Sequence, residues 1–124
     1  MAHPIRIKVG ELDIPAELND SETAKAILEA LPLIGNANCW GNEIYFSISV
    51  RMEAGPDARF EMSVGELAYW PPGKAFCILF GPTPASSDDT PRMASESNPI
   101  GQVTGDATAF RTVKNGEEVV VEKG

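Results

Sequence analysis

Residues 69–84 read YWPPGKAFCILFGPTP, and this stretch places a turn between two strands. Pro71, Pro72 and Gly73 together predict a tight turn, because proline fixes φ and glycine accepts positive φ. The apolar run from Ala75 to Phe80 predicts a strand that is buried on both faces or covered on its outer face by another segment. The residues around 69–84 therefore decide where one strand ends and the next begins.

The chain on either side of this stretch also alternates apolar and polar residues, which is the pattern of half-buried strands. Residues 5–9 and 12–18 flank the Gly10-Glu11 turn and predict an N-terminal hairpin. Further strands are expected at residues 42–50, 60–64, 67–70 and 118–122. So many short strands predict a mostly β protein built as an antiparallel barrel.

One main α-helix is predicted at about residues 21–31. Its apolar residues recur at i, i+3, i+4 and i+7 and so share one face: Ala24, Ile27, Leu28 and Leu31. Asn19 and Glu22 have the spacing of a capping box at the start of the helix. Pro32 ends it, because the residue before a proline is pushed out of the helical region.

Residues 81–99 contain four prolines among Ser, Thr and Asp, and they predict a long loop. Loops of this length are uncommon in compact domains and are often functional. We expect this loop either to cover a ligand cleft or merely to cap one end of the barrel. A short polar stretch before the Asn115-Gly116 turn is compatible with one helical turn.

Length and charge limit the possible functions. The chain has 124 residues, a net charge of −8 and 43% hydrophobic residues, which predicts a single domain over residues 1–124. The negative charge opposes binding to nucleic acid or anionic membranes. No apolar run approaches a membrane span, and no signal-peptide core is found, so we expect a soluble cytoplasmic protein.

Few residues in the sequence suggest metal or nucleophilic chemistry. The only histidine, His3, lies near the chain end, which disfavours Ser/His/Asp triads, Cys/His pairs and most zinc sites. Cys39 and Cys77 lie among apolar or aromatic neighbours and predict two buried thiols, with a disulfide or a reactive cysteine as alternatives. We expect no metal site and no cofactor.

Several blocks resemble a family of small prokaryotic cyclophilin-like proteins of unknown function. They follow the family's order along nearly the whole chain and are Ala16–Asn19, Leu31–Pro32, Trp40–Phe46, Tyr69–Ala75, Phe80–Pro84 and Asn98–Gly101. The segment Ile100–Asp106 is also similar to a glycine-containing segment in the C-terminal half of cyclophilins. The resemblance implies a closed antiparallel β-barrel of about eight strands, with helices at its ends.

The resemblance also raises the question of peptidyl-prolyl isomerase activity. Working cyclophilins carry a Phe-His-Arg-Ile-Ile-Pro block, and this chain has none. Isomerisation needs a donor directed at the imide nitrogen and an apolar pocket for the ring. Arg51 is the best of the available arginines for that role, although a solvated strand end is the simpler interpretation.

Six residues are candidates for ligand binding: Trp40, Glu43, Tyr45, Tyr69, Trp70 and Phe80. The aromatic residues among them combine an apolar body with, in Tyr and Trp, a polar tip. Each could instead pack in the core or close a barrel end. Glu43 could bind a cation or act as a base, or simply accept hydrogen bonds from a turn. The favoured function is a non-catalytic module that binds a peptide or small molecule in an aromatic-lined cleft, and the alternative is an isomerase with a rearranged site.

Overall fold

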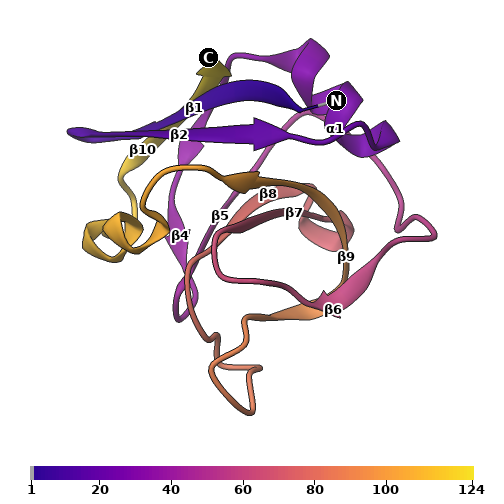
Figure 1. The fold of residues 1–124 in the computed structure, drawn as a ribbon, viewed down its shortest axis with the longest axis vertical. Coiled ribbons are helices and arrows are strands. Elements are labelled where there is room, and N and C mark those ends of the chain that lie inside the picture. The colour runs from indigo at the N-terminus through magenta and orange to yellow at the C-terminus, as the bar shows by residue number, and fades with distance from the viewer. Residues whose placement is uncertain (1) are drawn as a thin grey trace.

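The computed structural model describes residues 2–124 and shows strands wrapped around a common centre (Figure 1). Helix α1 lies at the upper end of this view, and the loop at residues 80–91 projects from the lower end. In chain order the elements are β1 His3–Val9, β2 Leu12–Leu18, α1 Glu22–Ala30, β3 Leu33–Asn36, β4 Asn38–Cys39, β5 Glu43–Ser47, β6 Arg59–Glu61, β7 Glu66–Trp70, η1 Pro71–Gly73, β8 Ala75–Leu79, β9 Arg92–Val103, η2 Ala107–Thr112 and β10 Glu118–Lys123.

The strands form one antiparallel sheet in the order β3-β10-β1-β2-β9-β7-β8-β5-β4, and β6 pairs with β9 beside this path. The prediction of a mostly β, antiparallel protein with one main helix is therefore confirmed. The sheet has ten strands where about eight were expected. No strand pairing within residues 2–124 joins β3 to β4, the two ends of the order, so closure of the barrel stays a prediction.

Helix α1 begins with a different N-cap residue from the one that the predicted capping box requires. The N-cap is Ser21, whose Oγ accepts a 3.2 Å hydrogen bond from the Ala24 amide. Asn19 instead accepts from the Ser21 amide, so its side chain shapes the turn before the helix and the Asn19–Glu22 box is wrong. The helix ends before Pro32, as predicted, with Leu31 in an extended conformation.

The alternation along the central strands separates two apolar clusters. Opposite residues in an antiparallel pair share a face, and neighbours along a strand point to opposite faces. Ile44, Phe46, Phe76 and Ile78 lie on the inner face and belong to the main core. Ala75, Cys77 and Leu79 lie on the outer face and form a smaller cluster with Met62, Ala68 and Met93. Strand β8 is buried throughout, as its uninterrupted apolar run predicted.

The predicted loop at residues 81–99 is wrong for its second half. Residues 92–103 form β9, the longest strand, which pairs with β2, β6 and β7. Polar side chains hid this strand, and Pro99 made a central strand look improbable. Pro99 lies opposite Ala68, where the β7–β9 register shifts, so the sheet accommodates its missing amide donor at an irregularity.

The turn at residues 71–74 differs from the prediction in one respect. Pro71–Gly73 form a single 3₁₀ turn, and the residue with positive φ is Lys74, at 48°, not Gly73. Gly73 is required for another reason: a Cβ atom there would lie 2.7 Å from two carbons of the Trp70 ring. The glycine thus lets the chain turn closely around that indole.

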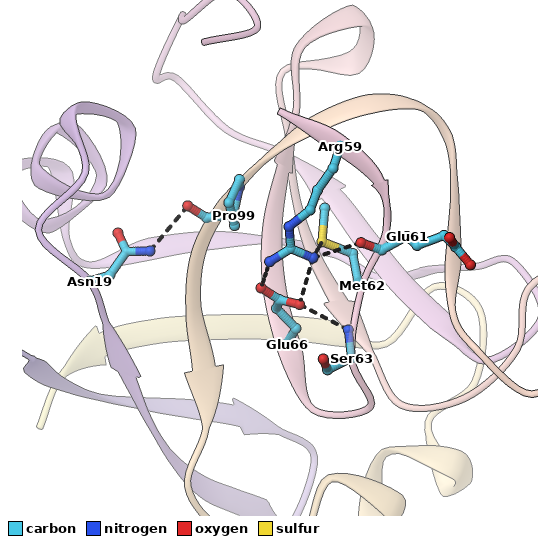
Figure 2. A network of polar contacts seen from close by, with 7 residues as sticks. All are labelled: Asn19, Arg59, Glu61, Met62, Ser63, Glu66 and Pro99. Carbon is cyan, nitrogen blue, oxygen red and sulfur yellow. Dashed lines mark hydrogen bonds and ion pairs between the residues drawn. The ribbon is translucent and has the colours of Figure 1, made fainter. Parts of the chain in front are cut away.

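Arg59 links strand β6 to the start of β7 through a network of polar contacts, as Figure 2 shows. The guanidinium donates through Nη1 to Glu61 O at 2.6 Å, to Met62 Sδ at 3.2 Å and to Glu66 Oε1 at 3.1 Å, and through Nη2 to Glu66 Oε2. Ser63 N donates to the same carboxylate at 2.9 Å. These contacts fix the β6–β7 turn and keep the buried Met62 in the outer cluster.

A second polar anchor holds the segment between β5 and β6. The buried Asn98 donates from Nδ2 to Thr23 Oγ1 and to Glu53 O, both at 3.0 Å, and its Oδ1 accepts from Gly55 N at 2.8 Å. This side chain therefore ties β9 to helix α1 and to the loop at residues 48–58. Within the described chain, no helix has the length and apolar character that crossing a membrane requires.

Candidate functional site

An aromatic cleft of about 200 Å³ lies over the outer face of the sheet. Its lining residues are Trp40, Glu43, Tyr45, Trp70, Met93 and Ala94. Four of the six predicted ligand-binding residues are among them. They come from β5, β7 and the turn before β5, and β9 supplies the other two.

Strand register explains why these side chains meet. Tyr45 lies opposite Cys77, and Trp70 lies opposite Ala75, two residues earlier on β8. All four residues therefore point to the outer face. The rings of Tyr45 and Trp70 pack edge to face, with centroids 6.2 Å apart and planes at 70°.

Hydrogen bonds position the two tryptophans that line the cleft, Trp70 through its indole and Trp40 through its backbone. Trp70 Nε1 donates to Ser95 Oγ at 2.7 Å, which fixes the ring against β9. Trp40 sits at the start of a tight turn, in which Trp40 N donates to Glu43 O at 2.9 Å and Glu43 N donates to Trp40 O at 3.2 Å. Gly41 has a φ of 60° within this turn, a conformation that favours glycine.

Glu43 is the most unusual residue of the cleft. Its side chain is only 3% exposed, and its Oε1 atom has no hydrogen-bond partner among the described residues. Burial raises the pKa of the Glu43 carboxyl to about 7, and the neighbouring Cys77 thiol opposes part of that rise. The carboxyl therefore changes its charge near neutral pH.

Tyr69 and Phe80, the other two predicted ligand contacts, lie in the main core and do not line the cleft. Tyr69 is fully buried; its hydroxyl donates to Val50 O at 2.8 Å and accepts from Met52 N at 3.2 Å. Phe80 packs against Phe110, with ring centroids 6.2 Å apart. Strand alternation gives the reason: Tyr69 directly precedes Trp70, so the two rings point to opposite faces.

Met93 and Ala94 line the cleft, but the sequence did not single them out. Both were assigned to a loop, although Met93 lies in a buried position of β9. The signal in the sequence is weak, because the positions that share a face with Met93, residues 95 and 97, are serines and not apolar residues. Asp88 and Asp89, also in the predicted loop, are exposed.

The two cysteines are free thiols in different surroundings. Cys77 is buried, as predicted; burial raises its pKa well above the ordinary value, and the nearby Glu43 carboxylate adds to the rise. Cys39 is exposed, so the prediction of a second buried thiol is wrong. It lies on the short β4 strand at the end of the sheet, where little covers it. Among residues 2–124, no group of three or more His, Cys, Asp and Glu side chains could hold a metal ion.

The fold and the cleft define an antiparallel, mostly β protein with an aromatic recess on its outer wall. The sequence matches the family described as cyclophilin-like over residues 3–122, and the chain belongs to that family. This confirms the resemblance found in the sequence. No curated protein matches the chain in sequence.

Solved structures that share the fold include the following two. One is the solution structure of the hypothetical protein AF2241 from Archaeoglobus fulgidus, with 38% sequence identity and a TM-score of 0.83; the match covers 99% of this chain and 95% of that protein. The other is McbB in complex with tryptophan, with 20% identity and a TM-score of 0.65; the match covers 96% of this chain but 44% of McbB. The second likeness concerns the fold alone.

Proposed function

We propose that this chain is a binding module that holds a peptide or small molecule in the cleft of Trp40, Glu43, Tyr45 and Trp70. The observation that carries the proposal is the convergence of three aromatic side chains and one buried carboxyl on a single recess. Binding sites are typically concave, mostly apolar and equipped with a few polar groups that orient the ligand. Since the net charge is −8, nucleic acid and anionic membranes are poor candidates for the partner.

A single cyclophilin-like domain accounts for the chain in this proposal, in keeping with the family match over residues 3–122. We also propose that residues 33–39 close the barrel. β3 pairs with β10, and β4 pairs with β5, so one bent segment contacts both sides of the gap. Ala37, the residue between them, donates to Glu117 O at 2.7 Å.

A prolyl isomerase is the weaker candidate. None of the residues that line the cleft is an arginine or a histidine. Arg51 is exposed and follows β5 outside the cleft, which suits a solvated strand end. A measurement of cis/trans exchange in Xaa-Pro peptides should therefore give the uncatalysed rate, and a clear acceleration would replace the binding proposal.

Tryptophan fluorescence provides the direct test of binding. The chain has two tryptophans, and both line the cleft, so a change in emission reports on this site. A panel of small molecules and peptides that do not contain tryptophan should include ligands that shift the emission and saturate. Trp40→Ala and Tyr45→Ala should weaken that binding, while Tyr69→Phe, altered in the core, should not. The absence of any response across the panel would contradict the proposal.

A further inference from the structure

The buried carboxyl of Glu43 needs a chemical explanation. A buried polar group without a partner destabilises a fold, and an unpaired buried charge does so more strongly. The strand position itself does not require a carboxyl, because its neighbour across the ladder, Leu79, is apolar. A buried carboxyl with an unpaired oxygen beside a cleft is a candidate functional group.

Among residues 2–124, no cationic side chain forms an ion pair with this carboxyl. The groups that face Glu43 are the Cys77 thiol and Leu79 from β8, Tyr45 from β5, Trp40 from the preceding turn and Met93 from β9. Only the thiol and the phenol among these can titrate, and neither supplies a positive charge. None of the ion pairs found between residues 2 and 124 includes Glu43.

The walls of the cleft favour an organic cation. Aromatic faces attract ammonium groups, and that attraction strengthens when water is excluded. Three aromatic residues and the apolar Met93 line the same cleft as Glu43, and the whole protein carries a charge of −8. A volume of about 200 Å³ is below the roughly 300–1,000 Å³ typical of sites for drug-sized ligands, so the bound group is small.

We propose that the cleft binds a protonated amine attached to a small apolar group, with the ammonium donating to Glu43 Oε1 and the apolar part lying against Trp40, Tyr45 and Trp70. This inference rests on the proposed function and narrows its ligand class. The amine belongs either to a free small molecule or to a lysine side chain of a peptide, since both offer the same ammonium group.

The ionisation of Glu43 makes the affinity for an amine depend on pH. An alkylamine stays protonated through neutral pH, as lysine does with its pKa of about 10.4. The ammonium needs an ionised Glu43, whose pKa is about 7 in the free protein, so affinity should rise about tenfold from pH 6 to pH 8. A neutral ligand that accepts from the protonated carboxyl should show the reverse.

The test compares 2-phenylethylamine with 2-phenylethanol, two probes of nearly equal shape that differ in charge. Tryptophan fluorescence titrations at pH 6, 7 and 8 should show the amine binding at least tenfold more tightly than the alcohol at pH 8, with less difference at pH 6. Glu43→Gln should remove both the preference and the pH dependence. Glu29→Gln, the same change on the exposed side of α1, should leave both intact.

The outcomes separate this inference from the proposed function. Equal or tighter binding of the alcohol, or affinity for the amine that falls as pH rises, would overturn the amine inference and leave a binding cleft. If neither probe changes the fluorescence while other panel members bind, the amine inference is overturned as well. If no member of the panel changes the fluorescence, the proposed function itself is contradicted. Both probe comparisons use the unmodified protein, so they hold even if Glu43→Gln fails to fold.

A lysine peptide and its norleucine analogue distinguish the two sources of the ammonium. If the natural ligand is a peptide, the lysine form should bind more tightly than phenylethylamine, and the norleucine form should not bind. If the ligand is a free amine, the peptide should bind more weakly than phenylethylamine. Loss of the lysine-over-norleucine preference in a peptide that binds would contradict recognition of the ammonium.

Discussion

Gly73 lies so close to the indole of Trp70 that an added Cβ would stand 2.7 Å from ring atoms Cε3 and Cζ3. The same indole donates to Ser95 Oγ on its other side, so the ring is held between η1 and β9. Gly73 itself does not line the cleft, yet it determines where one wall of the cleft stands. The glycine and the aromatic wall therefore act as one unit.

Gly73→Ala should displace the Trp70 ring, because the methyl group cannot share its space. We expect a shift in tryptophan emission and a several-fold loss of affinity for any ligand that responds in the fluorescence panel. Gly55→Ala is the matched control: the nearest atom to its added Cβ is Asn98 Oδ1 at 3.8 Å, an ordinary contact. Equal effects of the two substitutions would contradict this account of Trp70.

Tyr69→Phe should lower stability and leave the cleft unchanged. The substitution removes the hydroxyl that bonds Val50 O and Met52 N, and the loss of buried hydrogen bonds costs about 1–2 kcal/mol of unfolding free energy. Urea unfolding measures this loss. Tyr45→Phe, on the outer face, is the control and should affect stability less. If the Tyr69→Phe protein were fully stable but bound ligand more weakly, Tyr69 would have to contribute to ligand binding after all.

The two tyrosines illustrate what strand patterns can predict. Period-two alternation along residues 42–50 puts Tyr45 on the face opposite Ile44 and Phe46, as in the structure, and the same rule separates Tyr69 from Trp70. Aromatic character alone does not distinguish the two faces, so it predicts Tyr69 and Phe80 as ligand contacts together with Trp70. The local sequence therefore predicts the β5 residues of the cleft correctly, but the candidate set mixes residues from both faces of the sheet.

Long-range pairing was harder to predict. β9 was hidden because its residues are polar where they pair with the exposed β6, and because Pro99 interrupts the pattern at a register shift. Without β9, Met93 and Ala94 could not be assigned to the cleft. The buried state of Glu43 also depends on packing across strands, which composition and spacing do not report. The family resemblance predicts the overall fold even where the strand pattern fails, but it says nothing about the burial of the Glu43 carboxyl.

Asn98→Ala should release the loop at residues 48–58. Its amide makes three hydrogen bonds, to Thr23, Glu53 and Gly55, from a buried position. Removing such a group leaves buried partners unpaired, and we expect a loss of about 2–3 kcal/mol. Hydrogen exchange of the Gly55 amide should also become faster.

A matched change elsewhere tests whether burial is the reason. Asn36 is exposed and donates one 3.0 Å bond to Gly116 O, so Asn36→Ala should have a much smaller effect on urea unfolding. Similar losses in the two variants would show that the Asn98 network has no special weight. Unchanged exchange at Gly55 would contradict its role as the anchor of the loop.

Glu43 should make the protein less stable as pH rises. Its folded-state pKa is raised from 4.5 to about 7, so between these values the native carboxyl keeps a proton that the unfolded chain releases. The contribution of this proton to the unfolding free energy is therefore complete below about pH 4.5. It declines by roughly 3 kcal/mol between about pH 4.5 and pH 7 for such a shift. Glu43→Gln has no such proton, so urea unfolding at pH 5 and pH 8 should show the variant gaining on the unmodified protein at the higher pH. Glu29→Gln should show no such change, and a constant difference between Glu43→Gln and the unmodified protein at both pH values would mean that the carboxyl is not held neutral by burial.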